Sequence, residues 1–283
     1  MTDFFLALLD PNSGFLRLAL AAGTLASFSF GIMGTYVVTR RIGYLAGAIA
    51  HCAFGGIGAA LYLKNRWGVL WLDPMYGALA SAVIAAIIIG LVSMKAGERE
   101  DSIIGALWAV GMAAGLIFID LTPGYFELTS YLFGDILLIA RQDIILVAVL
   151  DLVIITLAIV FHPTFQAICF DEEFATLRGI NTSFFYILLL VMTAVTVVLL
   201  VRLVGVIMVI AMLTLPAAAA STLSRRLSTI MVLSIAFSLF FNWSGLALSY
   251  TLDLSAGPVI ISVAGLVYLG LLMLRRWLPA RQT

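Results

Sequence analysis

The chain has 283 residues, of which 63% are hydrophobic and only 11% are charged, and its mean hydropathy is +1.16. A soluble globular domain is about a quarter charged, so this composition excludes a water-solvated fold and is typical of an integral membrane protein. The formal net charge is zero and the 15 Lys and Arg residues are scattered in ones and twos. That scatter excludes nucleic acid as a partner, because nucleic-acid binding needs a basic surface.

Nine apolar segments are each long enough to cross a bilayer. About 20 helical residues span roughly 30 Å of hydrocarbon, and lipid requires every backbone group to be bonded within its own segment. The sequence therefore predicts an all-α, polytopic membrane bundle that forms a single domain over residues 1–283. The expected spans are 15–39, 44–63, 75–94, 102–119, 143–161, 183–201, 203–221, 228–246 and 257–274. A tenth segment, 129–139, is too short to cross and contains Asp135, so it is predicted to be re-entrant, with a structural carboxylate.

The distribution of Lys and Arg predicts the orientation of the chain in the membrane. Cytoplasmic loops are enriched in these residues. With the N-terminus outside, ten of the 15 basic residues fall in inner loops, although Lys64 and Arg66 form an outer pair against the trend. We therefore expect an N-terminus outside and a C-terminus in the cytoplasm. The N-terminal stretch has no early Lys or Arg and no cleavage pattern, so the first span is expected to be retained.

Several motifs that carry enzyme chemistry are missing. The sequence has no GxxxxGK[ST], so it does not bind nucleotide phosphates through a P-loop. It also has no HExxH, no GxSxG and no Cys and His cluster with zinc spacing. An enzyme is therefore not expected, and any ATP-driven transport requires ATP to be bound by another subunit.

His51 is an ionisable residue inside the second expected span. Gly43, Gly47 and His51 are spaced by four and share a helix face that another helix can approach closely. An intramembrane histidine is a functional-site hypothesis by default. The alternative is a structural hydrogen bond across a helix contact, and the residues alone leave both interpretations open.

Asp151 interrupts the apolar run of the expected span 143–161. A carboxylate at this depth requires a polar partner or a water-filled cavity. The sequence does not decide whether its role is structural or functional.

The segment 162–182 is the longest polar stretch between two spans on the expected cytoplasmic side. Acidic residues 171–173 suit the start of a short helix, and Gly179 suits its end. Such a helix would present Phe174 and Leu177 to a cytoplasmic partner. A solvated loop is the alternative, and the residues alone do not separate the two.

Pro216 lies within the expected span 203–221, which follows its predecessor after only Arg202 and Leu203. That short connection predicts a tight outer hairpin. Proline removes a backbone donor and frees the carbonyl of Met212, so the sequence predicts a kink at Pro216.

Six motifs, in this order, resemble the permease subunits of bacterial ABC importers for zinc, manganese and iron, the ABC-3 family. Each motif is weak alone, but their shared order and spacing from about residue 23 onward are specific. They are YLAGAIAH at 44–51, DSIIG at 101–105, YLFGDIL at 131–137, EFATLRG at 173–179, VGVIMVIAMLTLPAAAA at 204–220 and SYTLDLSAGPVII at 249–261.

The resemblance implies a homodimeric permease in the bacterial inner (cytoplasmic) membrane, working by alternating access. A divalent metal is then the transported substrate, with no permanently bound cofactor. A cytoplasmic ABC ATPase would bind the ATP, and an extracytoplasmic metal-binding protein would deliver the metal. The 162–182 segment would be the coupling loop that contacts the ATPase, through Glu172, Glu173, Ala175 and Gly179.

In such permeases an Asp and a His one helical turn apart are thought to hold the metal in transit. Here the resemblance places His51 at the histidine position, but Gly47 stands where the aspartate would be. Two His51 side chains alone would give a weaker site, so metal binding is expected to be transient. Asp151, or the methionines 112, 208 and 212, are further candidate contributors. The rival prediction is an ion-coupled secondary carrier that works without an ATPase and uses Asp151 and His51 as relay groups.

Overall fold

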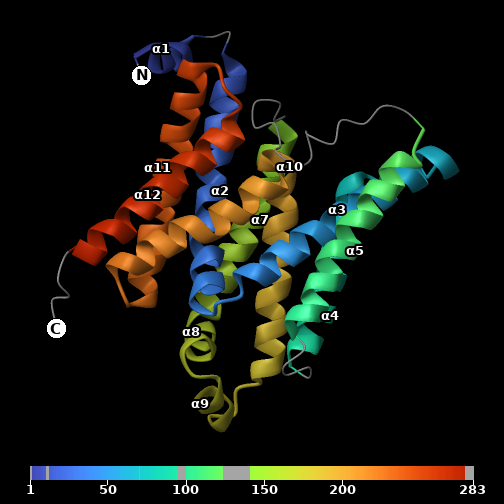
Figure 1. Ribbon diagram of the computed structural model, residues 1–283, viewed down its shortest axis with the longest axis vertical. Coiled ribbons are helices and arrows are strands. Elements are labelled where there is room, and N and C mark those ends of the chain that lie inside the picture. Colours follow the sequence, from blue (N-terminus) through green and yellow to red (C-terminus); the bar gives the residue numbers. More distant parts are fainter. Residues whose placement is uncertain (1, 11–12, 70, 95–99, 124–140, 278–283) are drawn as a thin grey trace.

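The computed structural model describes residues 2–10, 13–69, 71–94, 100–123 and 141–277, and all the regular elements among them are helices (Figure 1). The predicted re-entrant segment 129–139 and Asp135 lie outside these residues. The helices are α1 (Thr2–Leu9), α2 (Gly14–Thr39), α3 (Gly43–Trp67), α4 (Pro74–Ser93), α5 (Glu100–Asp120), α7 (Arg141–Val160), α8 (His162–Phe170), α9 (Glu172–Leu177), α10 (Thr182–Leu223), α11 (Leu227–Leu252) and α12 (Ala256–Trp277).

The helices have the length and composition of membrane spans. Within the described residues, eight are long and apolar enough to cross a bilayer, and a ninth span arises if α7 and α8, which meet at a bend of 68°, are counted as one. The predicted polytopic helical bundle is therefore confirmed. Its expected boundaries differ from the observed ones mainly at α11, which extends to Leu252 rather than ending near residue 246.

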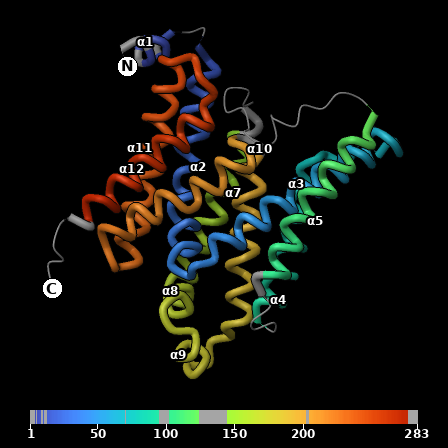
Figure 2. The backbone as a smooth tube through the Cα atoms, viewed as in Figure 1, coloured from blue at the N-terminus to red at the C-terminus, as the bar shows by residue number. Residues whose placement is uncertain are grey.

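The helix α10 is two spans joined by a sharp break. The halves are Thr182–Val201 and Val204–Leu223, and Gly205, near the start of the second half, has φ 78° and ψ 163°. The chain turns abruptly at this point (Figure 2). Only glycine adopts such a conformation without strain, so the chain can turn here, beside the connection expected at Arg202 and Leu203. Pro216 lies in the second half with no non-helical residue around it, and the bend expected there stays a prediction.

The helix α2 is central, because it packs against α7, α10 and α11. Two glycines allow this close approach. A Cβ atom on Gly31 would lie 2.6 Å from the backbone nitrogen of Ile235, and one on Gly34 would overlap the carbonyl oxygen of Leu213. Small residues at helix contacts are the usual means of packing in membranes, where water does not drive apolar association.

The helices α3, α4 and α5 form a second group on one side of the molecule (Figure 1). In its most apolar window α3 is 83% buried, whereas α5 is only 17% buried. The helix that carries His51 is therefore enclosed by protein, and α5 forms much of its cover. The outer faces of α4 and α5 remain exposed in one copy of the chain.

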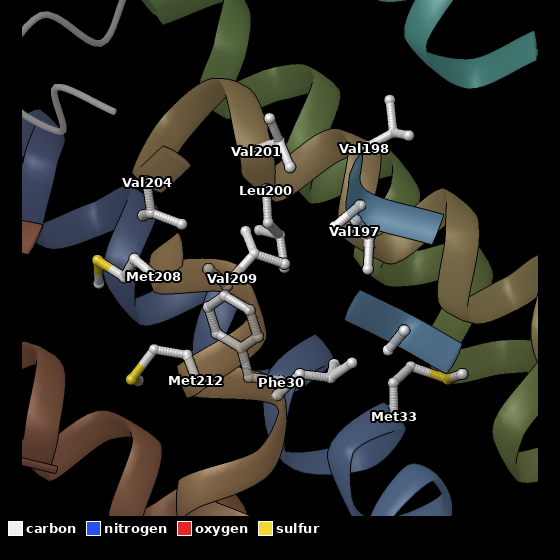
Figure 3. Close-up of a cluster of buried hydrophobic side chains, with 14 of the residues drawn as sticks. Phe30, Met33, Val197, Val198, Leu200, Val201, Val204, Met208, Val209 and Met212 are labelled. Atoms are coloured by element: carbon white, nitrogen blue, oxygen red, sulfur yellow. The ribbon is translucent and has the colours of Figure 1, made fainter. Parts of the chain in front are cut away.

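The core between α2 and α10 is apolar. Phe30 and Met33 of α2 lie in one cluster with Met208, Val209 and Met212 of α10 (Figure 3). Each of these side chains is buried. Met208 and Met212, named above as candidate metal contributors, therefore serve the packing of the core.

The short helices α8 and α9 lie at the end of the molecule opposite α1 (Figure 1). They connect α7 to α10. The bundle thus presents one compact helical projection at this end, within the segment 162–182 that the sequence singled out.

Candidate functional site: a histidine in the bundle and a helical projection at its end

His51 lies on the side of α3 that faces α5. Its Nδ1 is 2.9 Å from the carbonyl oxygen of Gly47, and its ring packs on the indole of Trp108 with centroids 4.6 Å apart. A carbonyl oxygen only accepts hydrogen bonds, so Nδ1 carries the hydrogen and the neutral ring keeps its lone pair on Nε2. Nε2 is therefore the atom that His51 can offer to a metal ion.

The space beside Gly47 is occupied by Trp108. A Cβ atom on Gly47 would lie 3.3 Å from two carbons of the Trp108 indole and 3.9 Å from Cδ1 of Ile210. A carboxylate at this position would require the indole to move. The Trp108 indole thus fills the space that an aspartate at position 47 would need. The sequence did not indicate this contact.

His51 has no protein partners for a complete metal site in the described part of the chain. No three His, Cys, Asp or Glu side chains among these residues are arranged to hold a metal ion. A structural zinc site needs four protein ligands, and a catalytic one needs three. Among the described residues of one copy, His51 therefore lacks the further ligands of such a site, and its contact with a metal ion stays a prediction.

Asp151 joins α7 to α2. Its side chain is 5% exposed and accepts a hydrogen bond from the Ser29 hydroxyl, while its second oxygen has no partner among the described protein atoms. Its other neighbours include Val147 and Leu199, around a gap too small to hold a water molecule. The polar partner expected for Asp151 is therefore Ser29. Asp151 does not join His51 in a ligand group, and a transport role for it stays a prediction.

The projection α8–α9 has well-defined ends. Asp171 caps α9 by accepting a hydrogen bond of 2.8 Å from the backbone N–H of Phe174. Gly179 follows the helix with φ 82°, and the N–H of Ile180 bonds back to the carbonyl of Ala175. This is the Schellman ending that the sequence pattern predicted. The segment therefore contains the short helix and not the solvated loop, two alternatives that the residues alone left open.

The face of α9 that points away from the bundle is partly apolar. Phe174 is 51% exposed and Leu177 is 87% exposed, whereas Ala175 is 1% exposed and packs inward. Glu173 is exposed on the same short helix. Exposed large apolar side chains beside charged ones form a surface suited to contact with a protein.

Glu172 is directed differently from Glu173, because it forms an ion pair with Arg40 at the end of α2. Arg40 also donates a hydrogen bond of 3.1 Å to the carbonyl oxygen of Ile168 in α8. Sequence reasoning grouped Glu172 with a surface that faces a partner and missed Arg40. The two residues are 132 positions apart, and nothing in the local pattern connects them.

Many apolar helices long enough to cross a membrane, with a short helical projection at one end and an ionisable side chain enclosed inside, are the arrangement of a membrane permease. The model of the ABC 3 transport family matches residues 12–275. The chain belongs to this family, and it is a membrane permease subunit of an ABC transporter.

Several known proteins are similar over most of their length. A Chlamydia trachomatis serovar D protein named "Probable metal transport system membrane protein" is 40% identical over 91% of this chain and 88% of its own. The manganese transport system membrane protein MntC of Listeria innocua serovar 6a is 29% identical over 90% of this chain and 89% of its own. The solved structure of PsaBC from Streptococcus pneumoniae in complex with Fab matches with a TM-score of 0.84 at 27% identity, over 95% of this chain and 94% of that one.

Proposed function

We propose that this permease imports a divalent metal ion, with manganese as the first candidate, through a pathway formed by two copies of the chain. Energy comes from ATP that a separate cytoplasmic ATPase binds and hydrolyses. The family match and the similarity to the MntC protein support this proposal. They also favour it over the secondary carrier considered above, because ABC permeases work with an ATPase.

His51 carries the proposal at the residue level. Two copies of the chain bring two Nε2 atoms to one pathway. Imidazole is a good ligand for zinc and iron and binds manganese more weakly, because manganese favours oxygen ligands. Two neutral nitrogens form an incomplete site, so the metal retains water as its remaining ligands. Weak, incomplete coordination suits transit, because an ion in a pathway must leave as readily as it enters.

The partners follow from the two ends of the bundle. The projection α8–α9 is the coupling loop: Glu173, Phe174 and Leu177 meet the ATPase, while Ala175 and Gly179 set the shape of the helix. This places α9 and the C-terminus in the cytoplasm, and the N-terminus outside a bacterial inner membrane. An extracytoplasmic metal-binding protein delivers the ion on that outer side.

The experiment replaces His51 with Ala and measures uptake of manganese, zinc and iron by cells that depend on this transporter. We expect uptake to fall about tenfold. Loss of the His51 ligand would cost about 1.4 kcal/mol of binding free energy for the metal in the pathway, and this corresponds to a factor of ten. Cys52→Ala is the matched control, since Cys52 is the next residue on α3 and donates its hydrogen bond to the Leu107 carbonyl and not to the His51 ring. Unchanged uptake of all three metals by the His51→Ala variant at normal membrane levels would contradict the proposal.

A further inference from the structure

The end of α2 holds the projection α8–α9 at two points. Arg40 binds Glu172 of α9 and the carbonyl oxygen of Ile168 in α8. One helical turn earlier, the hydroxyl of Tyr36 lies 2.9 Å from Nδ1 of His162, the first residue of α8. Both ends of α8 are therefore attached to the same helix. We call Tyr36 and Arg40 with these partners the α2 clamp.

The clamp is packed and not merely a surface ion pair. Tyr36 is fully buried, and its ring lies 5.3 Å from that of Phe165 in the middle of α8. The guanidinium of Arg40 lies over the ring of Tyr186 at 5.4 Å, and the side chain is 23% exposed. An exposed salt bridge contributes little to stability, but a guanidinium with an ion pair, a carbonyl and an aromatic ring is fixed in place.

The clamp is adjacent to the helix that carries His51. Only Arg40, Arg41 and Ile42 separate α2 from α3. Arg41 has φ 62°, and the N–H groups of Arg41 and Ile42 bond back to α2, so this connection is a closed turn. His51 lies eight residues after Gly43, which is about 12 Å along the helix. A displacement of the turn is therefore transmitted to His51 along a single helix.

We propose that Arg40 is a positioning residue for transport, which transmits motion of the coupling helix α9 to α3 and thereby to the metal pathway. The proposal rests on the proposed function, because it requires an ATPase that moves α9. The contacts define a continuous route, from Glu172 through the Arg40 side chain and the backbone of the turn that joins α2 to α3, to His51. The ATPase subunit hydrolyses ATP at its own site. Loss of this route is therefore expected to lower metal movement while ATP hydrolysis continues.

The test uses the full complex of the permease with its ATPase in proteoliposomes, and measures manganese uptake and ATP hydrolysis in the same sample. Arg40→Gln and Glu172→Gln each remove the ion pair with little change in volume. We expect uptake per ATP hydrolysed to fall about tenfold in both, with assembly and hydrolysis retained. A purely structural role would lower assembly, or lower uptake and hydrolysis together, and would leave their ratio unchanged.

Three further variants sharpen the result. The double variant Arg40→Gln, Glu172→Gln is expected to have the same ratio as either single variant, because both remove one shared contact. Arg40→Lys keeps the charge beside Glu172 and is expected to retain most of the wild-type uptake per ATP hydrolysed. Arg41→Gln is the matched control, since it removes the same charge from the same turn at an exposed residue, and it is expected to leave the ratio unchanged.

Normal uptake per ATP hydrolysed in both single variants would overturn the proposal. So would a double variant whose loss of uptake per ATP equals the product of the two single losses. If Arg40→Gln fails to assemble, Glu172→Gln decides, because its side chain is 41% exposed on a surface helix and its loss does not disturb the core. A wild-type complex that shows no ATP-dependent uptake would instead contradict the proposed function, so the two failures are distinguishable.

Discussion

Trp108 shapes the immediate surroundings of His51. Its indole lies on the imidazole at a centroid distance of 4.6 Å and fills the space where a side chain at position 47 would begin. Together with the Nδ1 contact to the Gly47 carbonyl, it fixes the ring so that Nε2 is the free nitrogen. Gly47 and Trp108 are therefore a complementary pair, in which the small residue makes room for the large one.

A carboxylate introduced at Gly47 tests this complementarity. We expect Gly47→Asp to destabilise the permease by about 1–3 kcal/mol, because the indole must leave its position. Trp108→Ala combined with Gly47→Asp is expected to recover stability and to gain a manganese-dependent rise in melting temperature, since the carboxylate then lies one turn from His51. Thermal unfolding in detergent, with and without manganese, measures both effects.

The Trp108→Ala single variant is the control for the cavity alone, and it is expected to show no manganese-dependent rise. Equal melting temperatures for Gly47→Asp and the wild type would show that the indole does not restrict position 47.

At the scale of elements, α3 is positioned by glycines on both its neighbours. A Cβ atom on Gly55 would lie 2.6 Å from the carbonyl oxygen of Gly111 in α5, and one on Gly56 would overlap that of Gly77 in α4. The helices therefore meet backbone to backbone. Because the contacts lie a turn beyond His51, they fix the depth and rotation of the helix that carries it.

One added methyl group tests this packing. We expect Gly56→Ala to lower the free energy of unfolding by about 1–3 kcal/mol, since no flexible side chain can move aside to accommodate the Cβ. Gly270→Ala in α12 is the matched control, because a Cβ there meets nothing within 4 Å. Thermal stability of the detergent-solubilised permease measures the difference, and an equal stability of the two variants would contradict this account of the α3–α4 contact.

The molecule as a whole combines α3, a helix enclosed by protein, with a projection at one end. Its eight candidate spans among the described residues place lipid around the bundle, and α9 extends from it with Glu173, Phe174 and Leu177 exposed. In the proposed function, the permease contributes the pathway and a docking surface, and the energy for transport enters through that surface.

Charge reversal on the projection tests docking in the assembled transporter. Glu173→Lys is expected to reduce metal uptake and the binding of the ATPase by about tenfold, because an acidic contact becomes basic at an interface. The permease itself is expected to keep its stability, since Glu173 is exposed. Co-purification of the ATPase with the permease measures the effect.

Arg178→Gln is the comparison variant, because Arg178 is also exposed near the end of α9 but packs on the Phe174 ring at 4.9 Å. Normal ATPase binding and coupled uptake by the Glu173→Lys variant would show that the contact lies elsewhere.

The sequence by itself determined the features that depend on one segment and its solvent. Span positions follow from apolar runs because lipid leaves the backbone no partner outside its own helix. The ends of α9 were indicated by Asp171 and Gly179, whose capping contacts lie within one or two turns, although the residues alone did not separate this helix from a solvated loop. The side of His51 that faces protein followed from the four-residue spacing of Gly43, Gly47 and His51.

Only the tertiary structure decided which side chains meet across helices. The Arg40 and Glu172 pair, the Ser29 hydroxyl on Asp151 and the Trp108 ring over Gly47 each join separate helices. Such contacts depend on the crossing angle and rotation of every helix in the bundle, and many apolar sequences with the same spans permit different rotations. A single sequence states what each helix is made of, whereas packing selects the residue that each side chain reaches.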